Sequence, residues 1–241
     1  MSVVSVVRKS IHQSVIDTLP DIPLLNIPLE KGDLYVLKKW RPDGLLTYQH
    51  VGMISDVTNS SIEHVDCVRE GCRVKVFEHE KKGRELYIAR LPMDIPYRDE
   101  IIREGIAISK YLIAHHKVTY LKMKQYHVGQ LLRILVGKCM GHVGWDELTM
   151  YIERFLKPYI NHTDYDGKTF TIFCNRFSML IYQLAAWYVF TKHKKSNQEI
   201  ATLLSTYFAF QPKYCRPWHI LMLGKGPRPW TVFRTVTWFK G

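Results

Sequence analysis

The sequence predicts an α+β protein in which an antiparallel sheet packs on helices. Two observations support this fold class. Between residues 32 and 91, short segments rich in strand-forming residues are separated by turn residues. From residue 98 onward, longer segments place apolar residues at helical spacing. The first part of the chain therefore forms the sheet, and the later part supplies the helices that pack on it.

The size and punctuation of the chain divide it into three parts. With 241 residues, 46% of them hydrophobic, the chain is long enough for one well-buried domain that carries a sizeable extension. Residues 1–29 are expected to form a helical arm that ends in a linker with three prolines. The domain occupies residues 30–190, and residues 191–241 form a basic, aromatic C-terminal extension.

Four strand segments form an antiparallel meander. Each is short and rich in residues that suit strands, and segments holding Gly, Pro, Asn or Asp separate them. The predicted strands are residues 32–37, 50–54, 72–77 and 86–91.

The helices follow from apolar residues spaced three or four apart. Residues 98–115 begin with two acidic residues, which suit the positive end of a helix. Residues 126–160 are helical again and belong to an insertion that ends near residue 168 with a turn at residues 164–167. After a brief extended segment, residues 174–190 form an amphipathic helix, and residues 199–208 form another.

Cysteine usage and the apolar segments indicate the location of the protein. Five cysteines are an odd number without framework spacing, so we expect no disulfide scaffold and a reducing compartment. The first residues lack a signal-peptide pattern, and the longest apolar stretch, residues 177–190, is too short to span a membrane. An intracellular, cytoplasmic protein is expected.

The chain is basic, with a formal net charge of +12 and a pI near 9.4, which favours polyanionic partners. Its C-terminal part interleaves Trp218, Trp230 and Trp238 with Lys and Arg, a composition that can stack on bases or lie at a lipid interface. No zinc-finger, RNP-type or helix-turn-helix pattern accompanies them. Two interpretations stay open: binding of an anionic surface, either membrane or nucleic acid, and ordinary packing of large side chains.

A cysteine and a histidine predict a nucleophilic site. Cys174 lies where a helix begins, so the helix N-terminus can stabilise its thiolate, and its own backbone N–H can face a substrate carbonyl. His50 lies on a predicted strand, which is a rigid platform for an imidazole. We therefore expect a Cys174 nucleophile with His50 as its base.

The imidazole also needs a polar neighbour that fixes its tautomer. A hairpin that returns from residues 50–54 brings a strand-like segment with Glu63, His64 and Asp66 alongside. Alternation along that segment places His64 and Asp66 on one face and Glu63 on the other. We favour Asp66, with His64 close behind.

Four short motifs point to one superfamily. They are Lys31-Gly32-Asp33-Leu34, His50-Val51-Gly52-Met53-Ile54, Gly71-Cys72-Arg73-Val74 and Phe173-Cys174-Asn175-Arg176-Phe177. Together they resemble the circularly permuted branch of the NlpC-type papain-like superfamily, which includes bacterial lipoprotein-like cysteine hydrolases, poxvirus proteins and the lecithin retinol acyltransferase group. The resemblance covers residues 31–91 and 98–190, and the order of histidine before cysteine is its distinctive part.

This resemblance implies a permuted papain-like fold and a cysteine hydrolase, peptidase or acyltransferase. His50 would be the general base, and Cys174 would attack a peptide, amide or lipid-ester carbonyl to form an acyl-enzyme. The third residue of the family would fall within residues 63–66. No cofactor is implied. A viral member would act in the host cytoplasm or the virion.

Departures from the family pattern support an alternative function. The chain has Cys-Asn-Arg-Phe where bacterial relatives often have Cys-Ser-Glu-Leu, and the insertion at residues 126–168 precedes the cysteine. A catalytically inactive relative that binds nucleic acid, membrane or protein partners is therefore the second hypothesis. The sequence carries no signal for an oligomeric state.

Two other arrangements of side chains compete with this site. His219, on a segment at residues 218–222 that could also be a strand, is a rival partner for Cys174. Cys67 and Cys72, and likewise Cys139 and His142, have spacings that zinc can use, but they do not make a complete set of four ligands in a compact arrangement. We expect no metal site.

Overall fold

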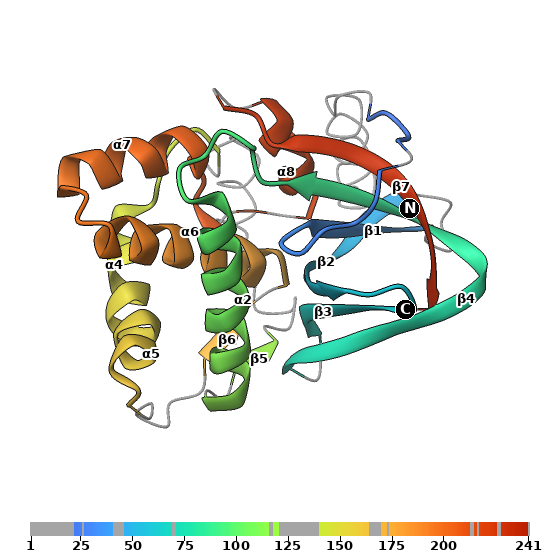
Figure 1. Cartoon of the computed structure of the whole chain (residues 1–241), viewed down its shortest axis with the longest axis horizontal. Coiled ribbons are helices and arrows are strands. Elements are labelled where there is room, and N and C mark those ends of the chain that lie inside the picture. Colours follow the sequence, from blue (N-terminus) through green and yellow to red (C-terminus); the bar gives the residue numbers. More distant parts are fainter. Residues whose placement is uncertain are drawn as a thin grey trace, which may run out of the picture.

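The computed structural model combines helices with an antiparallel sheet, as the sequence predicts (Figure 1). The described residues are 22–25, 27–40, 46–68, 71–115, 118–120, 140–163, 170–172, 174–212, 215, 217–225 and 228–240. Of the predicted arm and linker at residues 1–29, residues 1–21 and 26 lie outside this set, as do residues 126–139 of the predicted helical insertion and its turn at residues 164–167. Within it, no helix is both long and apolar enough to cross a membrane.

Five strands form the main sheet in the order β1-β2-β3-β4-β7. They are β1 (Leu34–Trp40), β2 (Leu46–Val57), β3 (Ser61–Val68), β4 (Gly71–Arg90) and β7 (Thr231–Lys240). Neighbouring strands pair antiparallel, which confirms the meander. The end of β4 also pairs with β1, with Leu34 opposite Ala89, so the first four strands close on themselves as a small barrel.

One long strand replaces two predicted ones. The sequence predicted separate strands at residues 72–77 and 86–91, but β4 runs unbroken over 20 residues. Its first part pairs with β3 and its last part with β1 and β7, and Figure 1 shows it curving around the side of the sheet away from the helices. A curved strand can change partners along its length without a turn, so the turn signal of Lys82 and Gly83 was misleading.

Helix α6 (Cys174–Lys192) is the central helix of the molecule. It packs on α2 (Arg98–His115) and against β2 and β3. Helix α2 has the predicted bounds, and α6 begins at the predicted residue. However, α6 is buried on nearly every side rather than on one amphipathic face, because helices cover it where the sheet does not.

The other elements complete the helical layer. They are α4 (Trp145–Tyr151), a π-helical turn (Ile152–Leu156), α5 (Lys157–Asn161), α7 (Asn197–Tyr207), α8 (Pro217–Met222) and a 3-10 turn (Leu223–Lys225). In the described part of the predicted insertion, helical structure therefore begins only at Trp145. Strands β5 (Val118–Tyr120) and β6 (Phe170–Ile172) form a separate parallel pair, of which only β6 was expected.

The C-terminal part, which the sequence predicts as a basic, aromatic extension, contributes to the sheet and the core. Strand β7 pairs with β4, and Phe233 on β7 is fully buried. Trp230 is 2% exposed, and its ring N–H donates to the Tyr207 carbonyl at 3.1 Å. Trp230 is thus a core residue, unavailable for stacking on bases. The side chains of Trp218 and Trp238 lie outside the described set.

A disulfide joins Cys67 and Cys72, a pair that the spacing of the cysteines did not predict. The two cysteines lie directly opposite each other in the β3–β4 hairpin, so strand register brings their side chains together. Cys174 and Cys215 are buried and lie outside this disulfide.

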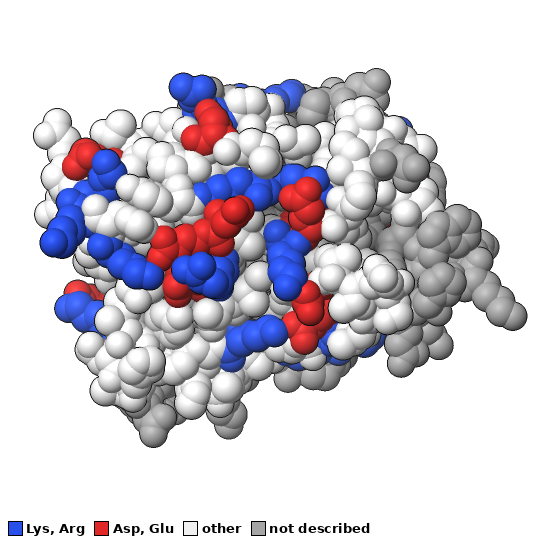
Figure 2. Space-filling model, viewed as in Figure 1, with Lys and Arg blue, Asp and Glu red and all other residues white. Residues whose placement is uncertain are grey.

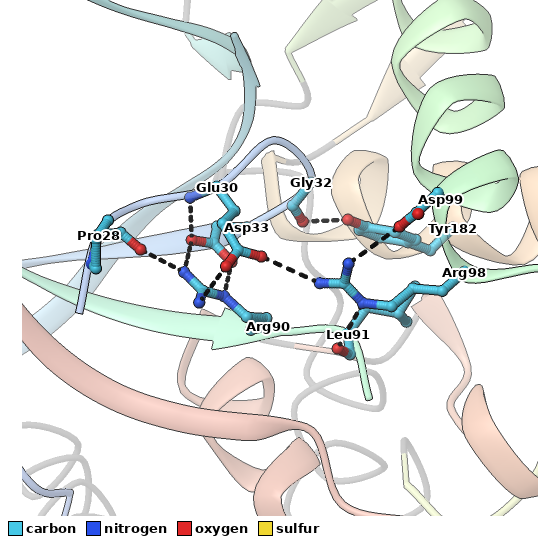
Figure 3. A network of polar contacts seen from close by, with 9 residues as sticks. All are labelled: Pro28, Glu30, Gly32, Asp33, Arg90, Leu91, Arg98, Asp99 and Tyr182. Atoms are coloured by element: carbon cyan, nitrogen blue, oxygen red, sulfur yellow. Dashed lines mark hydrogen bonds and ion pairs between the residues drawn. The ribbon is translucent and has the colours of Figure 1, made fainter. Parts of the chain in front are cut away.

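The start of β1 is tied to the end of β4 by a buried ion pair (Figure 3). The Arg90 guanidinium donates to both carboxylate oxygens of Asp33, each at 2.8 Å, and Asp33 is fully buried. Arg90 also donates to Glu30 at 2.8 Å, and Arg98 on α2 approaches Glu30 at 3.3 Å. The network holds the entry to the sheet against the first helix.

Charges of both signs are mixed on the surface. Figure 2 shows Lys and Arg side chains interspersed with Asp and Glu on the face that carries α2. The described surface contains short pairs such as Lys192–Glu100 at 2.6 Å and Lys31–Asp56 at 2.7 Å. The positive net charge is therefore not gathered into one patch on this face.

Candidate functional site

His50 and Asp66 meet on neighbouring strands inside the barrel. In the pairing of β2 with β3, Gly52 lies opposite Asp66, and His50 is the next residue on the same face of β2. The His50 side chain reaches across, and its Nε2 lies 2.8 Å from Asp66 Oδ2. The imidazole is about one-fifth exposed, whereas the carboxylate is almost completely buried.

Asp66 is held by three side chains. Besides His50, the Arg73 Nε donates to its Oδ1 at 3.0 Å, and the His64 Nε2 lies 3.4 Å from its Oδ2. Burial acts to raise the pKa of Asp66, but the hydrogen bonds with His50, His64 and Arg73 outweigh it and hold that pKa well below the usual range. The carboxylate therefore stays ionised beside His50 at neutral pH.

The three candidates for the orienting residue separate as strand alternation predicts. Glu63 faces the other side of β3, where it accepts hydrogen bonds from Ser55 at 2.7 Å and from Lys110 at 2.6 Å. His64 lies on the same face as Asp66 but stacks on Phe77, with ring centroids 3.9 Å apart. Asp66 is thus the candidate that bonds to His50.

Cys174 approaches the same imidazole from the helical layer. Burial lowers the pKa of His50, but hydrogen bonds with Asp66 and Cys174 overcome this and raise it from 6.5 to about 9. Because Nε2 is engaged by Asp66, Nδ1 is the ring nitrogen left for the thiol. His50 therefore lies between a carboxylate and a thiol, an arrangement suited to moving a proton from sulfur to nitrogen.

The first turn of α6 is fixed on both sides of the cysteine. Cys174 is 3% exposed, and its carbonyl accepts from the Ser178 hydroxyl at 3.1 Å. The Asn175 side chain donates to the Cys215 carbonyl at 2.5 Å. Arg176 binds Glu147 on α4 at 2.6 Å. These contacts hold the sulfur in a defined place relative to the sheet.

The rival histidine lies on a different type of element from the one predicted. His219 lies on α8, a helix, and not on the strand that the alternative pairing required.

Two residues without a predicted role complete the surroundings of His50. The Tyr35 ring on β1 lies over Gly52, where an added Cβ would be 2.5 Å from the ring atoms, and its centroid is 6.2 Å from that of His50. The Tyr35 hydroxyl is fully buried without a hydrogen-bond partner among the described residues. In the sequence, Gly52 was the signal for this arrangement, because a glycine inside a strand marks a close approach by another group.

The described residues contain no cluster of three or more His, Cys, Asp or Glu side chains placed to hold a metal ion. No protein-family model matches the chain, and comparison with curated proteins and with solved structures gives no match either.

Proposed function

We propose that the protein is a cysteine hydrolase or acyltransferase with a permuted papain-like fold, acting on a peptide, amide or lipid-ester carbonyl. One observation carries the proposal: the His50 imidazole, whose Nε2 lies 2.8 Å from the Asp66 carboxylate, has its pKa raised by Cys174 at the start of α6 as well as by Asp66. The order of the elements supports it as well, because the strand histidine precedes the helix that begins at the cysteine, as in the permuted branch of that superfamily.

The mechanism uses a covalent intermediate. His50 takes the Cys174 proton, and the thiolate attacks the carbonyl carbon, while the backbone N–H of Cys174 stabilises the oxyanion. The imidazolium then gives its proton to the leaving amine or alcohol, and the thioester remains. His50 next takes a proton from water or from an acceptor, whose oxygen or nitrogen attacks the thioester and releases the thiol. Asp66 keeps the imidazole oriented through both steps.

Thiol alkylation tests the proposal without a known substrate. We expect iodoacetamide to modify Cys174 at pH 6 at least about tenfold faster than free cysteine, because a nearby imidazolium favours the thiolate. His50→Gln should remove this advantage. The alkylation rate of Cys174 in Asp66→Asn should lie between the rates in the wild type and in His50→Gln. Loss of the carboxylate lowers the pKa of His50 and leaves less imidazolium at a given pH.

Mass spectrometry of the modified peptides measures the rate at each cysteine. Cys215, another buried cysteine among the described residues, is the internal reference. His219→Gln is the matched histidine control and should leave the Cys174 rate unchanged. A wild-type Cys174 that reacts no faster than free cysteine, with no effect of His50→Gln, would contradict the enzyme and favour the non-catalytic binding protein.

A further inference from the structure

Arg73 lies on β4, across β3 from the strand that carries His50. In the pairing of β3 with β4 it is directly opposite Asp66, and its Nε donates to Oδ1 at 3.0 Å. Its side chain is 44% exposed, against 3% for that of Asp66. The arginine therefore reaches from a buried anchor into solvent.

Most of the hydrogen-bonding capacity of this arginine is unused. A guanidinium has five N–H donors arranged as a rigid fork. Within the part of the chain that the structure describes, Asp66 is the side-chain partner of Arg73, and the bond uses Nε. Among the described residues, its two terminal NH₂ groups have no hydrogen-bond or ion-pair partner, and the side chain is largely exposed. This geometry is typical of arginines that bind a carboxylate or a phosphate through two parallel hydrogen bonds.

The Arg73 guanidinium lies near the His50 imidazole. His50 and Arg73 bind the two oxygens of one carboxylate, at 2.8 and 3.0 Å. These two contacts and the width of a carboxylate place the guanidinium Nε within about 8 Å of the imidazole. An acyl substrate of ordinary size spans that distance.

Neutralising Asp66 does not by itself require this arginine. The His50 Nε2 lies 2.8 Å from the Asp66 Oδ2, and the His64 Nε2 lies 3.4 Å from the same oxygen, so the carboxylate has polar partners besides Arg73. The positive charge of Arg73 is thus available to a ligand.

We propose that Arg73 determines specificity by binding an anionic oxygen group of the substrate, a carboxylate or a phosphate, close to the carbonyl that Cys174 attacks. This inference rests on the proposed function. It narrows the substrate class from any amide or ester to those that carry such an anion near the scissile bond.

The ratio of two alkylation rates isolates the contribution of Arg73. Iodoacetate carries a carboxylate and iodoacetamide does not, so the ratio of their rates at Cys174 reports attraction of an anion, separately from thiol reactivity. We expect the wild-type ratio to exceed that of free cysteine, and Arg73→Gln to lower it about fivefold, as for one charge a few ångströms away.

Lys75→Gln is the matched control. Lys75 lies two residues along β4 on the same face, so this variant removes one positive charge near the site but not the fork. Its ratio should stay within about twofold of wild type. An equal ratio in the wild type and Arg73→Gln, or an equal loss in both variants, overturns the inference.

A second measurement needs no variant. Acetate and inorganic phosphate should each be tested for protection of wild-type Cys174 against iodoacetamide. Protection by acetate alone indicates a carboxylate, protection by phosphate indicates a phosphate, and protection by neither overturns the inference. A cysteine that reacts with iodoacetamide no faster than free cysteine instead contradicts the proposed function, whatever the ratio is.

Discussion

At the scale of single residues, the site depends on the lack of a side chain at Gly52. Three side chains share the space over this glycine: the Tyr35 ring lies on it, His50 reaches past it, and Asp66 lies opposite it. Any larger residue would push the ring toward His50 or out of its buried position. The His-Val-Gly motif is therefore explained by packing as well as by chemistry.

Gly52→Ala should destabilise the protein by about 1–3 kcal/mol, the usual cost of overpacking a core. The added Cβ would lie 2.5 Å from the Tyr35 ring, which is fully buried and has no free space to enter. Urea unfolding measures the change.

Gly105→Ala is the control for that variant. A Cβ at Gly105 in α2 would meet Ile181 and Ala185 at 3.5 and 3.7 Å, which is ordinary contact. Because alanine favours helix, this change should be neutral or should stabilise by up to about 1 kcal/mol. Equal unfolding free energies for the two variants would show that the Tyr35 ring moves aside at little cost in stability.

At the scale of elements, α7, which was predicted at residues 199–208, is held at its start by its own residues. Helix α7 begins after Ser196, whose hydroxyl accepts from the Glu199 N–H at 3.3 Å, while the Glu199 carboxylate accepts from the Ser196 N–H at 2.8 Å. Such a capping box defines the start of a helix through contacts within a segment of four residues. By contrast, the apolar composition of residues 218–222 would also suit a strand. These residues are helical in α8, where the helix packs on the sheet.

Ser196→Ala should cost about 1 kcal/mol of stability, because the first turn of α7 loses its cap. Thermal or urea unfolding measures the loss. Ser205→Ala, a change at an exposed position within the same helix, should stay within about 0.5 kcal/mol of wild type. If the two variants lose the same unfolding free energy, the capping box does not stabilise α7.

At the scale of the whole molecule, closure of the barrel joins parts of the chain that are far apart in sequence. Arg90 at the end of β4 bonds to Asp33 at the start of β1, and Arg98 extends the network to α2 through Glu30. The Tyr182 hydroxyl on α6 donates to the Gly32 carbonyl in the same region (Figure 3). The sheet and the helix that carries Cys174 are thus positioned by one connected set of contacts.

Asp33→Asn should destabilise the fold by about 3–5 kcal/mol, because it leaves the buried Arg90 charge without its main partner. Asp56→Asn removes a carboxylate that pairs with Lys31 at an exposed position, and should cost less than about 1 kcal/mol. The unfolding free energies in urea compare the two. Similar losses would mean that the Asp33–Arg90 pair does not hold the barrel closed.

Much of the candidate site could be predicted from sequence, and the reason is periodicity. Alternation of side chains along β3 is enough to separate Glu63 from His64 and Asp66. The choice of Asp66 as the partner of His50 required the register of β2 on β3, which places it opposite Gly52. Arg73 and Tyr35 lie on two further strands, so their part in the site depends on pairings that no single segment encodes.

The sequence by itself determined the α+β class, the start of α6 at Cys174, the bounds of α2 and the short list of residues around His50, because each rests on local periodicity or on helix-end signals. The tertiary structure alone decided that β4 is one curved strand, that β7 and Trp230 belong to the core, that Cys67 bonds to Cys72 and that α8 is a helix. Those features depend on contacts between distant segments, whose free energy overrides local preference.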